Sequence, residues 1–429
     1  PAIAPAAPWA FPRPTVTELD SGLAVWAYDL PGQYILACNL ALELPLNAEP
    51  AGREGVATLA VRTLDEGTLA HPGLAYAAAL EDVGAEFSGF QGLSTTQCLL
   101  DVPSTGLDDA LALFAEAVAN PAFEHDDVAR IRANRLAEIE QQEARGSYVA
   151  STVLRETVLD ARLRGARPTG GETDQVAAIK AADVAGFHRR CYTPRGATLI
   201  IAGDLGDLDV AGSAERAFAA WRPDATPVEP ETPRPAPARR RLIHRAGAVQ
   251  ADIRLGWYGI DRGDPRWAGL QVATFIVGGG FNSRLNTRLR EELGYTYGVA
   301  LSPRPYRSAG LIDLATSTKT ASAPALIAEA LGILRRTEFT ADEVSDAISH
   351  LIMSAPLTFD TADAVAAQAA TLAAARLPLD HVTGHLRALA AVTPESAAEA
   401  YDSLITPDAA SIVVVGDAAE LAGLGFDQD

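Results

Sequence analysis

Residues 278–299 concentrate side chains that could bind a peptide at its reacting bond. They read GGGFNSRLNTRLREELGYTYGV. An arginine precedes a tyrosine by seven residues twice, as Arg288 with Tyr295 and as Arg290 with Tyr297. A guanidinium and a phenol can hydrogen-bond a peptide carbonyl, or stabilise the oxyanion that forms when that carbonyl is attacked.

A second stretch, residues 55–68, reads GVATLAVRTLDEGT. Together the two stretches resemble the pitrilysin and mitochondrial-processing-peptidase family of zinc metallopeptidases. The resemblance in residues 278–299 consists of a glycine turn, then SRL, then an RE…G..Y passage from helix to strand. It implies that Arg290 and Tyr297 reach toward substrate at a zinc site in a partner domain. The alternatives are the pair Arg288 and Tyr295, or a structural role in which Arg290 pairs with Glu291 or Glu292 and Tyr297 packs.

Active members of that family carry an HxxEH motif where residues 55–68 stand here. Two histidines one helical turn apart can bind one zinc ion, and the glutamate between them polarises the metal-bound water. The matching positions in this chain are Thr58, Val61 and Arg62. A threonine hydroxyl is a poor zinc ligand and a guanidinium repels the cation. We therefore expect no zinc in this chain and no hydrolysis by this chain alone.

The family's distal glutamate ligand is matched by Glu138, 76 residues after Arg62. If the fold is retained, Arg62 and Glu138 converge where the metal would lie, and an ion pair replaces the bound cation. The alternative is that both are solvated charges on helix faces.

The resemblance implies a non-catalytic, substrate-binding subunit of a heterodimeric peptidase, with zinc held by an HxxEH-bearing partner. Gly278, Gly279, Gly280 and Asn282 would contact the peptide, because consecutive glycines permit positive φ and close backbone approach. The same glycines equally suit a tight turn. A scaffolding subunit with no role in proteolysis is the alternative function. An active homodimer using another metal site is supported only by the i, i+4 pair His381 and His385, which has no Glu or Cys partner nearby.

Composition narrows the function classes. The chain has 429 residues, 48% of them apolar and 21% charged, as in globular proteins of more than one domain. Its net charge of −20 disfavours nucleic acid and anionic membranes and favours cationic peptides. The cysteines Cys38, Cys98 and Cys191 are scattered, which argues against disulfides or a zinc ribbon. Residues 1–14 do not resemble a signal peptide, so we expect a cytoplasmic protein.

The chain reads as two similar halves, 1–221 and 242–429, joined by a proline-rich linker over residues 222–241. Each half closes with Thr-Pro, then an apolar run, then Gly-Asp, and both motifs are separated by 213 residues. Such repetition indicates duplication. Strands early and helices later in each half predict an α+β domain used twice, and the resemblance implies a mainly antiparallel sheet with helices packed on it.

Two local elements are also predicted. Residues 23–28 and 34–44 read as a hairpin around Pro31-Gly32. Apolar residues at helical spacing predict a helix from the cap signal Ser104-Thr105 to the stop signal Asn120-Pro121.

Overall fold

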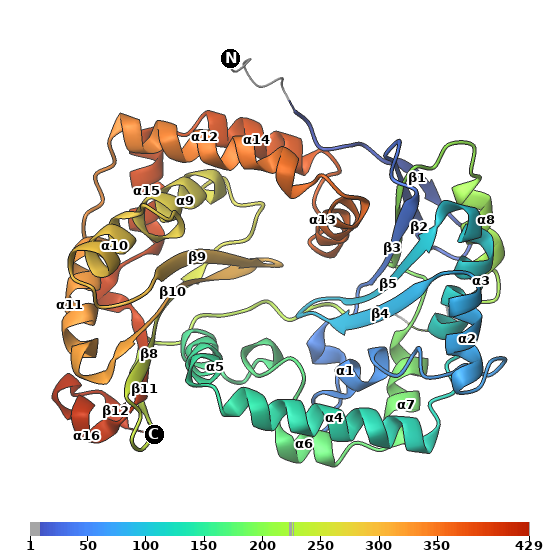
Figure 1. The fold of residues 1–429 in the computed structure, drawn as a ribbon, viewed down its shortest axis with the longest axis horizontal. Coiled ribbons are helices and arrows are strands. Elements are labelled where there is room, and N and C mark those ends of the chain that lie inside the picture. The colour runs from blue at the N-terminus through green and yellow to red at the C-terminus, as the bar shows by residue number, and fades with distance from the viewer. Residues whose placement is uncertain (1–8, 223–224, 226, 429) are drawn as a thin grey trace. The chain divides into compact units, whose positions relative to one another are not determined.

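The computed structural model describes residues 9–222, 225 and 227–428. These residues form two compact units, each built on a six-stranded mixed sheet (Figure 1). The strands of the first sheet are β1 (Thr15–Glu18), β2 (Ala24–Asp29), β3 (Ile35–Leu42), β4 (Glu86–Gln91), β5 (Thr96–Pro103) and β6 (Thr198–Gly203). Those of the second are β7 (Arg240–His244), β8 (Gln250–Gly259), β9 (Val299–Tyr306), β10 (Ala309–Lys319), β11 (Ser411–Gly416) and β12 (Asp427–Gln428).

The two sheets share one topology. Their strand orders are β1-β2-β6-β3-β5-β4 and β12-β7-β11-β8-β10-β9. In each, an entirely buried central strand, β6 or β11, pairs parallel on one side and antiparallel on the other. These two strands are the apolar runs before Gly203-Asp204 and Gly416-Asp417, so the predicted duplication and the α+β class are confirmed. The units differ at one sheet edge, which β1 forms antiparallel and β12 forms parallel.

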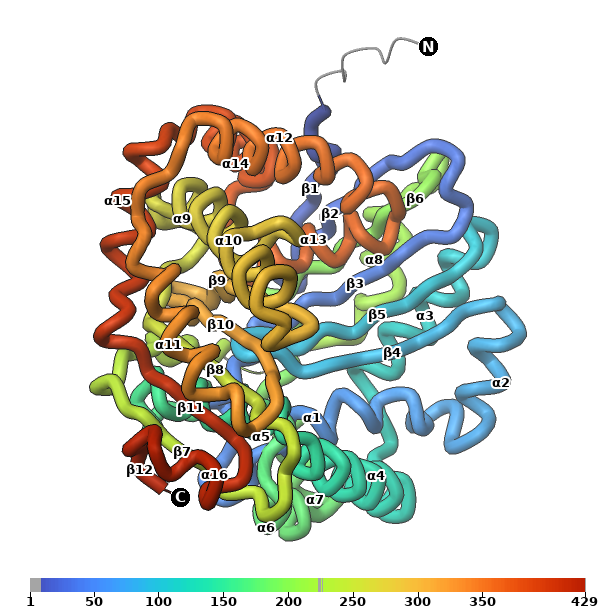
Figure 2. The backbone as a smooth tube through the Cα atoms, turned by 60° about the vertical axis from the view of Figure 1, so that its left-hand side comes forward, coloured from blue at the N-terminus to red at the C-terminus, as the bar shows by residue number. Residues whose placement is uncertain are grey.

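The predicted hairpin is wrong, although both of its strands exist. Strands β2 and β3 are not neighbours, because β6 is inserted between them; it pairs with both (Figure 2). The apolar sequence of β6 is buried at all six positions, which a central strand requires and an edge strand does not. Gly32 adopts φ +90° in the connecting turn, as its position after Pro31 suggested.

Helices cover both faces of each sheet. They are α1 (Val56–Val61), α2 (Leu74–Asp82), α3 (Leu107–Ala119), α4 (His125–Glu143), α5 (Gly146–Val158), α6 (Thr173–Ala177), α7 (Ala181–Cys191), α8 (Val210–Phe218), α9 (Trp267–Thr274), α10 (Arg284–Asn286), α11 (Ala323–Leu334), α12 (Ala341–Thr358), α13 (Ala362–Ala374), α14 (His381–Ala390), α15 (Pro394–Leu404) and α16 (Ala418–Leu421). Helix α3 confirms the helix predicted between the cap and stop signals.

Each compact unit borrows one helix from the other half of the sequence. The first comprises residues 1–139, 168–231 and 355–383, and the second residues 140–167, 232–354 and 384–429. Helix α13 packs on β3 and β6 through an alanine-rich face, and α5 packs on β8 and β11 through residues such as Leu154. The units therefore differ from the continuous segments 1–221 and 242–429, because the second face of each sheet is covered by a helix from the other half.

The proline-rich segment lies between the two sheets in the sequence. Residues 223, 224 and 226 of the predicted linker lie outside the described residues, as do residues 1–8 at the N-terminus. Arg240 and Arg241, predicted as linker, are the first residues of β7, since they pair in register with β11. Within the described residues, no helix combines the length and apolarity that crossing a membrane demands.

Candidate functional site

The first candidate site surrounds helix α1, which carries residues predicted to match the zinc motif. Its N-terminus is closed by Glu49, whose Oε1 accepts hydrogen bonds from the backbone N–H groups of Gly55 at 2.9 Å and Ala57 at 3.0 Å. Gly55 has φ +97°, and a Cβ there would come 2.7 Å from the carbonyl oxygen of Gly170. A glycine is therefore required where α1 begins.

Arg62 follows the last residue of α1 and faces Glu138 on α4. Its Nη1 donates to both carboxylate oxygens of Glu138, each at 2.8 Å. The predicted ion pair is therefore present, and the alternative of two separate solvated charges is wrong. The side chains of Arg62 and Glu138 are 37% and 39% exposed, so the pair is open to water.

A third charge completes this cluster. Arg135, one turn before Glu138 on α4, donates from Nη1 to Glu138 Oε2 at 3.1 Å and from Nε to the carbonyl of Gly170 at 3.1 Å. Unlike Arg62, the Arg135 side chain is nearly buried. Burial raises the pKa of Glu138, but the hydrogen bonds from Arg62 and Arg135 outweigh it, so the net pKa lies below the usual value. The carboxylate is ionised at neutral pH.

Sequence analysis missed Arg135. Its spacing of three residues before Glu138 would have placed both on one helix face, and that was the available signal. Gly170 was also missed, and no local pattern marks it. A Cβ on Gly170 would lie 2.6–2.7 Å from the Arg135 guanidinium, so a side chain there would force the guanidinium to shift.

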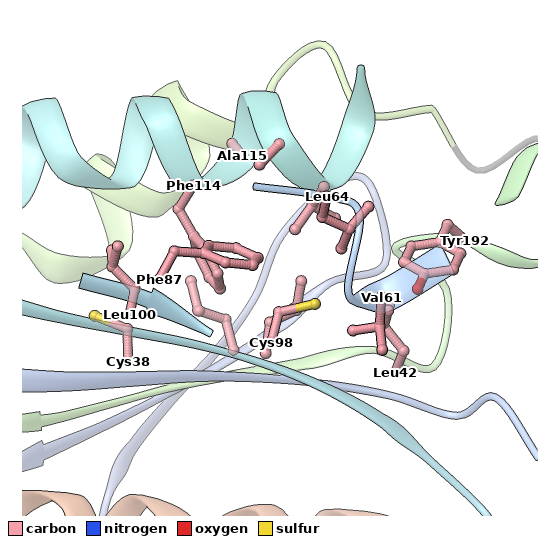
Figure 3. Packing of buried hydrophobic residues seen from close by; sticks show 14 of the residues in the cluster. Cys38, Leu42, Val61, Leu64, Phe87, Cys98, Leu100, Phe114, Ala115 and Tyr192 are labelled. Carbon is pink, nitrogen blue, oxygen red and sulfur yellow. The ribbon is translucent and has the colours of Figure 1, made fainter. Parts of the chain in front are cut away.

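Val61 is the residue predicted to match the general base. It is fully buried and belongs to the first hydrophobic core. Figure 3 shows it among apolar side chains, with the Tyr192 ring beside it. A Cβ added to Gly89 of β4 would lie only 2.6 Å from Cγ2 of Val61, so the two residues are in close contact. This position has become part of the packing, so it holds no group that could activate water.

Thr58 lies one helical turn before Arg62 and is the residue predicted to match the first histidine ligand. It is buried, and its hydroxyl has no hydrogen-bond partner among the described residues. The donor set for a metal is thus one hydroxyl, one carboxylate and a guanidinium already bound to that carboxylate. These residues do not fit zinc. Nowhere in the described part of the chain do three His, Cys, Asp or Glu side chains gather as metal ligands would.

The second candidate site lies in the other compact unit, around the glycine turn. Residues 275–279 and 287–292 form two π-helical segments, which are rare and frequently occur at functional sites. Between them, Asn286 is buried and bonds three backbone groups. Its Nδ2 donates to the carbonyls of Gly280 at 3.2 Å and Val299 at 2.9 Å, and its Oδ1 accepts from Val299 N at 2.9 Å. This amide, which sequence analysis did not single out, ties the glycine turn to β9.

Gly278, Gly279 and Gly280, which were predicted to bind substrate, differ in how closely neighbouring atoms pack against them. None has a positive φ. A Cβ on Gly278 would lie 2.6 Å from Leu301 Cβ, whereas the nearest atom to one on Gly279 would be 3.4 Å away. Gly280 and Asn282, together with Phe281 and Phe275, line a pocket of about 1150 Å³ between this turn and helices α11 and α12. Two of the four predicted substrate-binding residues therefore face a space that a ligand could enter.

Arg290 and Tyr297 have contrasting surroundings. Arg290 donates from Nε to Glu291 Oε1 at 2.9 Å and from Nη2 to the carbonyl of Phe281 at 3.2 Å, and its Cζ lies 3.9 Å from the centroid of the Phe281 ring. The ion pair of the structural alternative is thus present for Arg290. Tyr297 is 96% exposed, so it does not pack.

Arg288 and Tyr295, the alternative pair with the same spacing, both contact other residues of the second unit. Arg288 bonds Glu292 at 2.8 Å and Glu329 at 3.1 Å. Tyr295 is partly buried against the second hydrophobic core. Arg288 and Tyr295 both line the pocket, whereas Tyr297 is the more exposed of the two tyrosines, so each pair is open to a ligand on different grounds.

The fold defines a class: a duplicated α+β scaffold of the metallopeptidase type. Comparison with known proteins agrees. Residues 47–167 match the family described as insulinase (peptidase family M16), and residues 178–351 match the peptidase M16 inactive domain. The chain belongs to peptidase family M16.

Individual relatives span most of the chain. An uncharacterized zinc protease of Rickettsia bellii is 25% identical over 75% of this chain and 77% of its own length. A non-peptidase homolog, YmxG of Helicobacter pylori, is 23% identical over 72% of each chain. Among solved structures, a peptidase M16 inactive domain from Pseudomonas fluorescens superposes with a TM-score of 0.87 at 24% identity, covering 94% of this chain and 98% of the other. The last comparison concerns the fold alone.

Proposed function

We propose that this chain is the non-catalytic, substrate-binding subunit of a heterodimeric zinc metallopeptidase. A second M16 subunit with an intact HxxEH motif supplies the zinc and the general base. This chain supplies Arg290 and Tyr297, which bind the peptide carbonyl and the oxyanion that develops on it. The substrate is a peptide held in extended form, and the acidic surface of the chain favours basic peptides.

The observation that carries the proposal is the contrast between the two sites. At the position predicted to match the zinc motif, Val61 is buried in the core and Arg62 donates a hydrogen bond to Glu138. At the second site, Tyr297 is 96% exposed and makes no hydrogen bond with any described residue, so packing does not account for it. A ligand that the chain meets on assembly would account for it.

The experiment is reconstitution. The chain is purified from its native cell extract by an affinity tag, and co-purifying proteins are identified by mass spectrometry. Recovery of a partner of similar size that bears HxxEH, with zinc-dependent cleavage of unfolded peptides by the pair and by neither chain alone, is the expected result. Recovery in a complex without any HxxEH protein would instead favour the scaffolding function.

A further inference from the structure

The guanidinium of Arg62 has more hydrogen-bonding capacity than its one carboxylate partner uses. Glu138 accepts hydrogen bonds from Arg62 and from Arg135.

The hydrogen-bond pattern shows where that capacity lies. A guanidinium binds a carboxylate best when two nitrogens face two oxygens. Here a single nitrogen, Nη1 of Arg62, serves both oxygens of Glu138. Nε and Nη2, the other paired edge, donate to no described residue. Neither is among the buried polar atoms that lack a partner, so both reach solvent.

The cluster is also held in place before any ligand arrives. Arg135 fixes Glu138 from the buried side and is itself fixed by the Gly170 carbonyl. Arg62 is anchored at the end of α1, where its backbone N–H bonds the carbonyl of Thr58 at 3.2 Å. A preorganised guanidinium loses little conformational entropy when it binds an anion.

We propose that the former zinc position is a carboxylate-binding site, in which the Nε–Nη2 edge of Arg62 receives a carboxylate of a peptide. The carboxylate comes from the C-terminus or from an acidic side chain. The site thus selects an anion where active relatives hold a cation. The inference goes beyond the proposed function, since it requires neither a partner subunit nor cleavage.

The test uses the full chain alone at low ionic strength, because salt screens exposed charges. Three fluorescent alanine-based hexapeptides are titrated and followed by anisotropy: one with a free C-terminus, one amidated, and one amidated with a single aspartate. We expect at least one carboxylate-bearing peptide to bind on the order of tenfold tighter than the neutral one, as for one charge-assisted hydrogen bond. Which of the two binds identifies the source of the carboxylate.

Variants locate the effect. Arg62→Gln removes the preference, and Arg62→Lys, which keeps the charge but not the planar edge, weakens it. Arg53→Gln is the matched control, since the Arg53 side chain is also 37% exposed and bonds one carboxylate, Asp183, at 3.3 Å. It keeps the preference. Equal binding of all three peptides, binding of none, or a preference that survives Arg62→Gln in a variant with wild-type circular dichroism would overturn the proposal.

Discussion

Arg135 places a nearly buried guanidinium 3.1 Å from Glu138, opposite the half-exposed Arg62. The two arginines therefore depend unequally on the same carboxylate. Arg135 has little contact with water, so it depends more on Glu138 than the half-exposed Arg62 does, and Glu138 still has Arg135 if Arg62 is lost. The zinc-ligand pattern suggested a carboxylate that binds a metal cation. Glu138 instead binds the guanidinium groups of Arg62 and Arg135.

The first prediction follows from that asymmetry. Glu138→Gln is expected to lower the free energy of unfolding by about 2 kcal/mol, since it removes a charged hydrogen-bond acceptor from a nearly buried arginine. Arg62→Gln is expected to cost no more than about 1 kcal/mol, as for a solvent-open ion pair. Urea denaturation of both variants measures the difference. Equal losses would show that Arg135 does not depend on Glu138.

A second prediction concerns Asp65, just after α1. Burial raises the pKa of Asp65 to about 6. In the unfolded chain the group has its ordinary pKa near 4, so between pH 4 and 6 the folded state holds a proton that the unfolded state has lost. Its contribution to stability therefore falls as pH rises through this window. Above pH 6 both states are ionised and the penalty is constant.

Asp65→Asn removes that penalty. We expect the variant to be more stable than the wild type by about 1–2 kcal/mol at pH 8, less than the roughly 3 kcal/mol that two full pKa units represent. Below pH 4 the two proteins converge, because the carboxyl is then neutral in both states. Thermal unfolding across this pH range gives the comparison. A stability difference that does not change with pH would contradict the assigned titration.

A third prediction tests whether the fold still positions zinc ligands. In Thr58→His/Arg62→His, two imidazoles one helical turn apart join Glu138, which Arg62 no longer occupies. We expect this double variant to bind Zn²⁺ in calorimetry with 1:1 stoichiometry, while the wild type does not. Adding Glu138→Gln weakens that binding by about tenfold or more. Because Val61 remains, no peptide hydrolysis is expected, and zinc-dependent cleavage by the double variant would refute the account of the missing base.

Sequence reasoning succeeded where the pattern is local or strongly repeated. The runs that became β6 and β11, the helix from Leu107 to Ala119 and the pair Arg62–Glu138 all followed from spacing or from the family resemblance. The pairing of β2 with β6 did not, because strand order depends on contacts between residues about 170 apart, which no window along the chain contains.

For the same reason, the sequence did not predict that α5 and α13 each cover the sheet formed by the other half of the chain. Helix α5 has an apolar face whatever sheet it covers, so its sequence does not reveal that β8 and β11 receive it. At the second site, the sequence suggested that Gly278 permits a positive φ and close approach of a peptide backbone. The structure indicates a steric role for Gly278 instead, because Leu301 occupies the space that a side chain at position 278 would need.

That steric role gives the fourth prediction. Gly278→Ala is expected to destabilise the protein by about 1–3 kcal/mol, because its Cβ would overlap Leu301 and the turn would have to shift. Gly279→Ala, with its nearest atom at 3.4 Å, is expected to cost less than about 1 kcal/mol. Chemical denaturation of the pair decides the point. If both alanines were tolerated equally, the glycines would have to be explained by ligand contact rather than packing.

The last prediction addresses catalysis in the assembled pair. Arg290→Ala is expected to lower kcat for peptide cleavage on the order of 10²-fold while assembly is unchanged, as for loss of one transition-state hydrogen-bond donor. Tyr297→Phe removes only an exposed hydroxyl and should reduce kcat without changing the melting temperature of the free chain. The matched controls are Arg288→Ala, which breaks ion pairs to Glu292 and Glu329, and Tyr295→Phe.

The controls should separate structure from chemistry. We expect Arg288→Ala to lower thermal stability modestly and to leave kcat within about twofold, since exposed ion pairs contribute little. Because Arg290 is already bound to Glu291 and stacked on Phe281, it must exchange its carboxylate partner for the substrate, so Glu291→Gln should raise rather than lower peptide affinity. Wild-type turnover in Arg290→Ala, together with a loss in Arg288→Ala, would assign the substrate contact to the other pair.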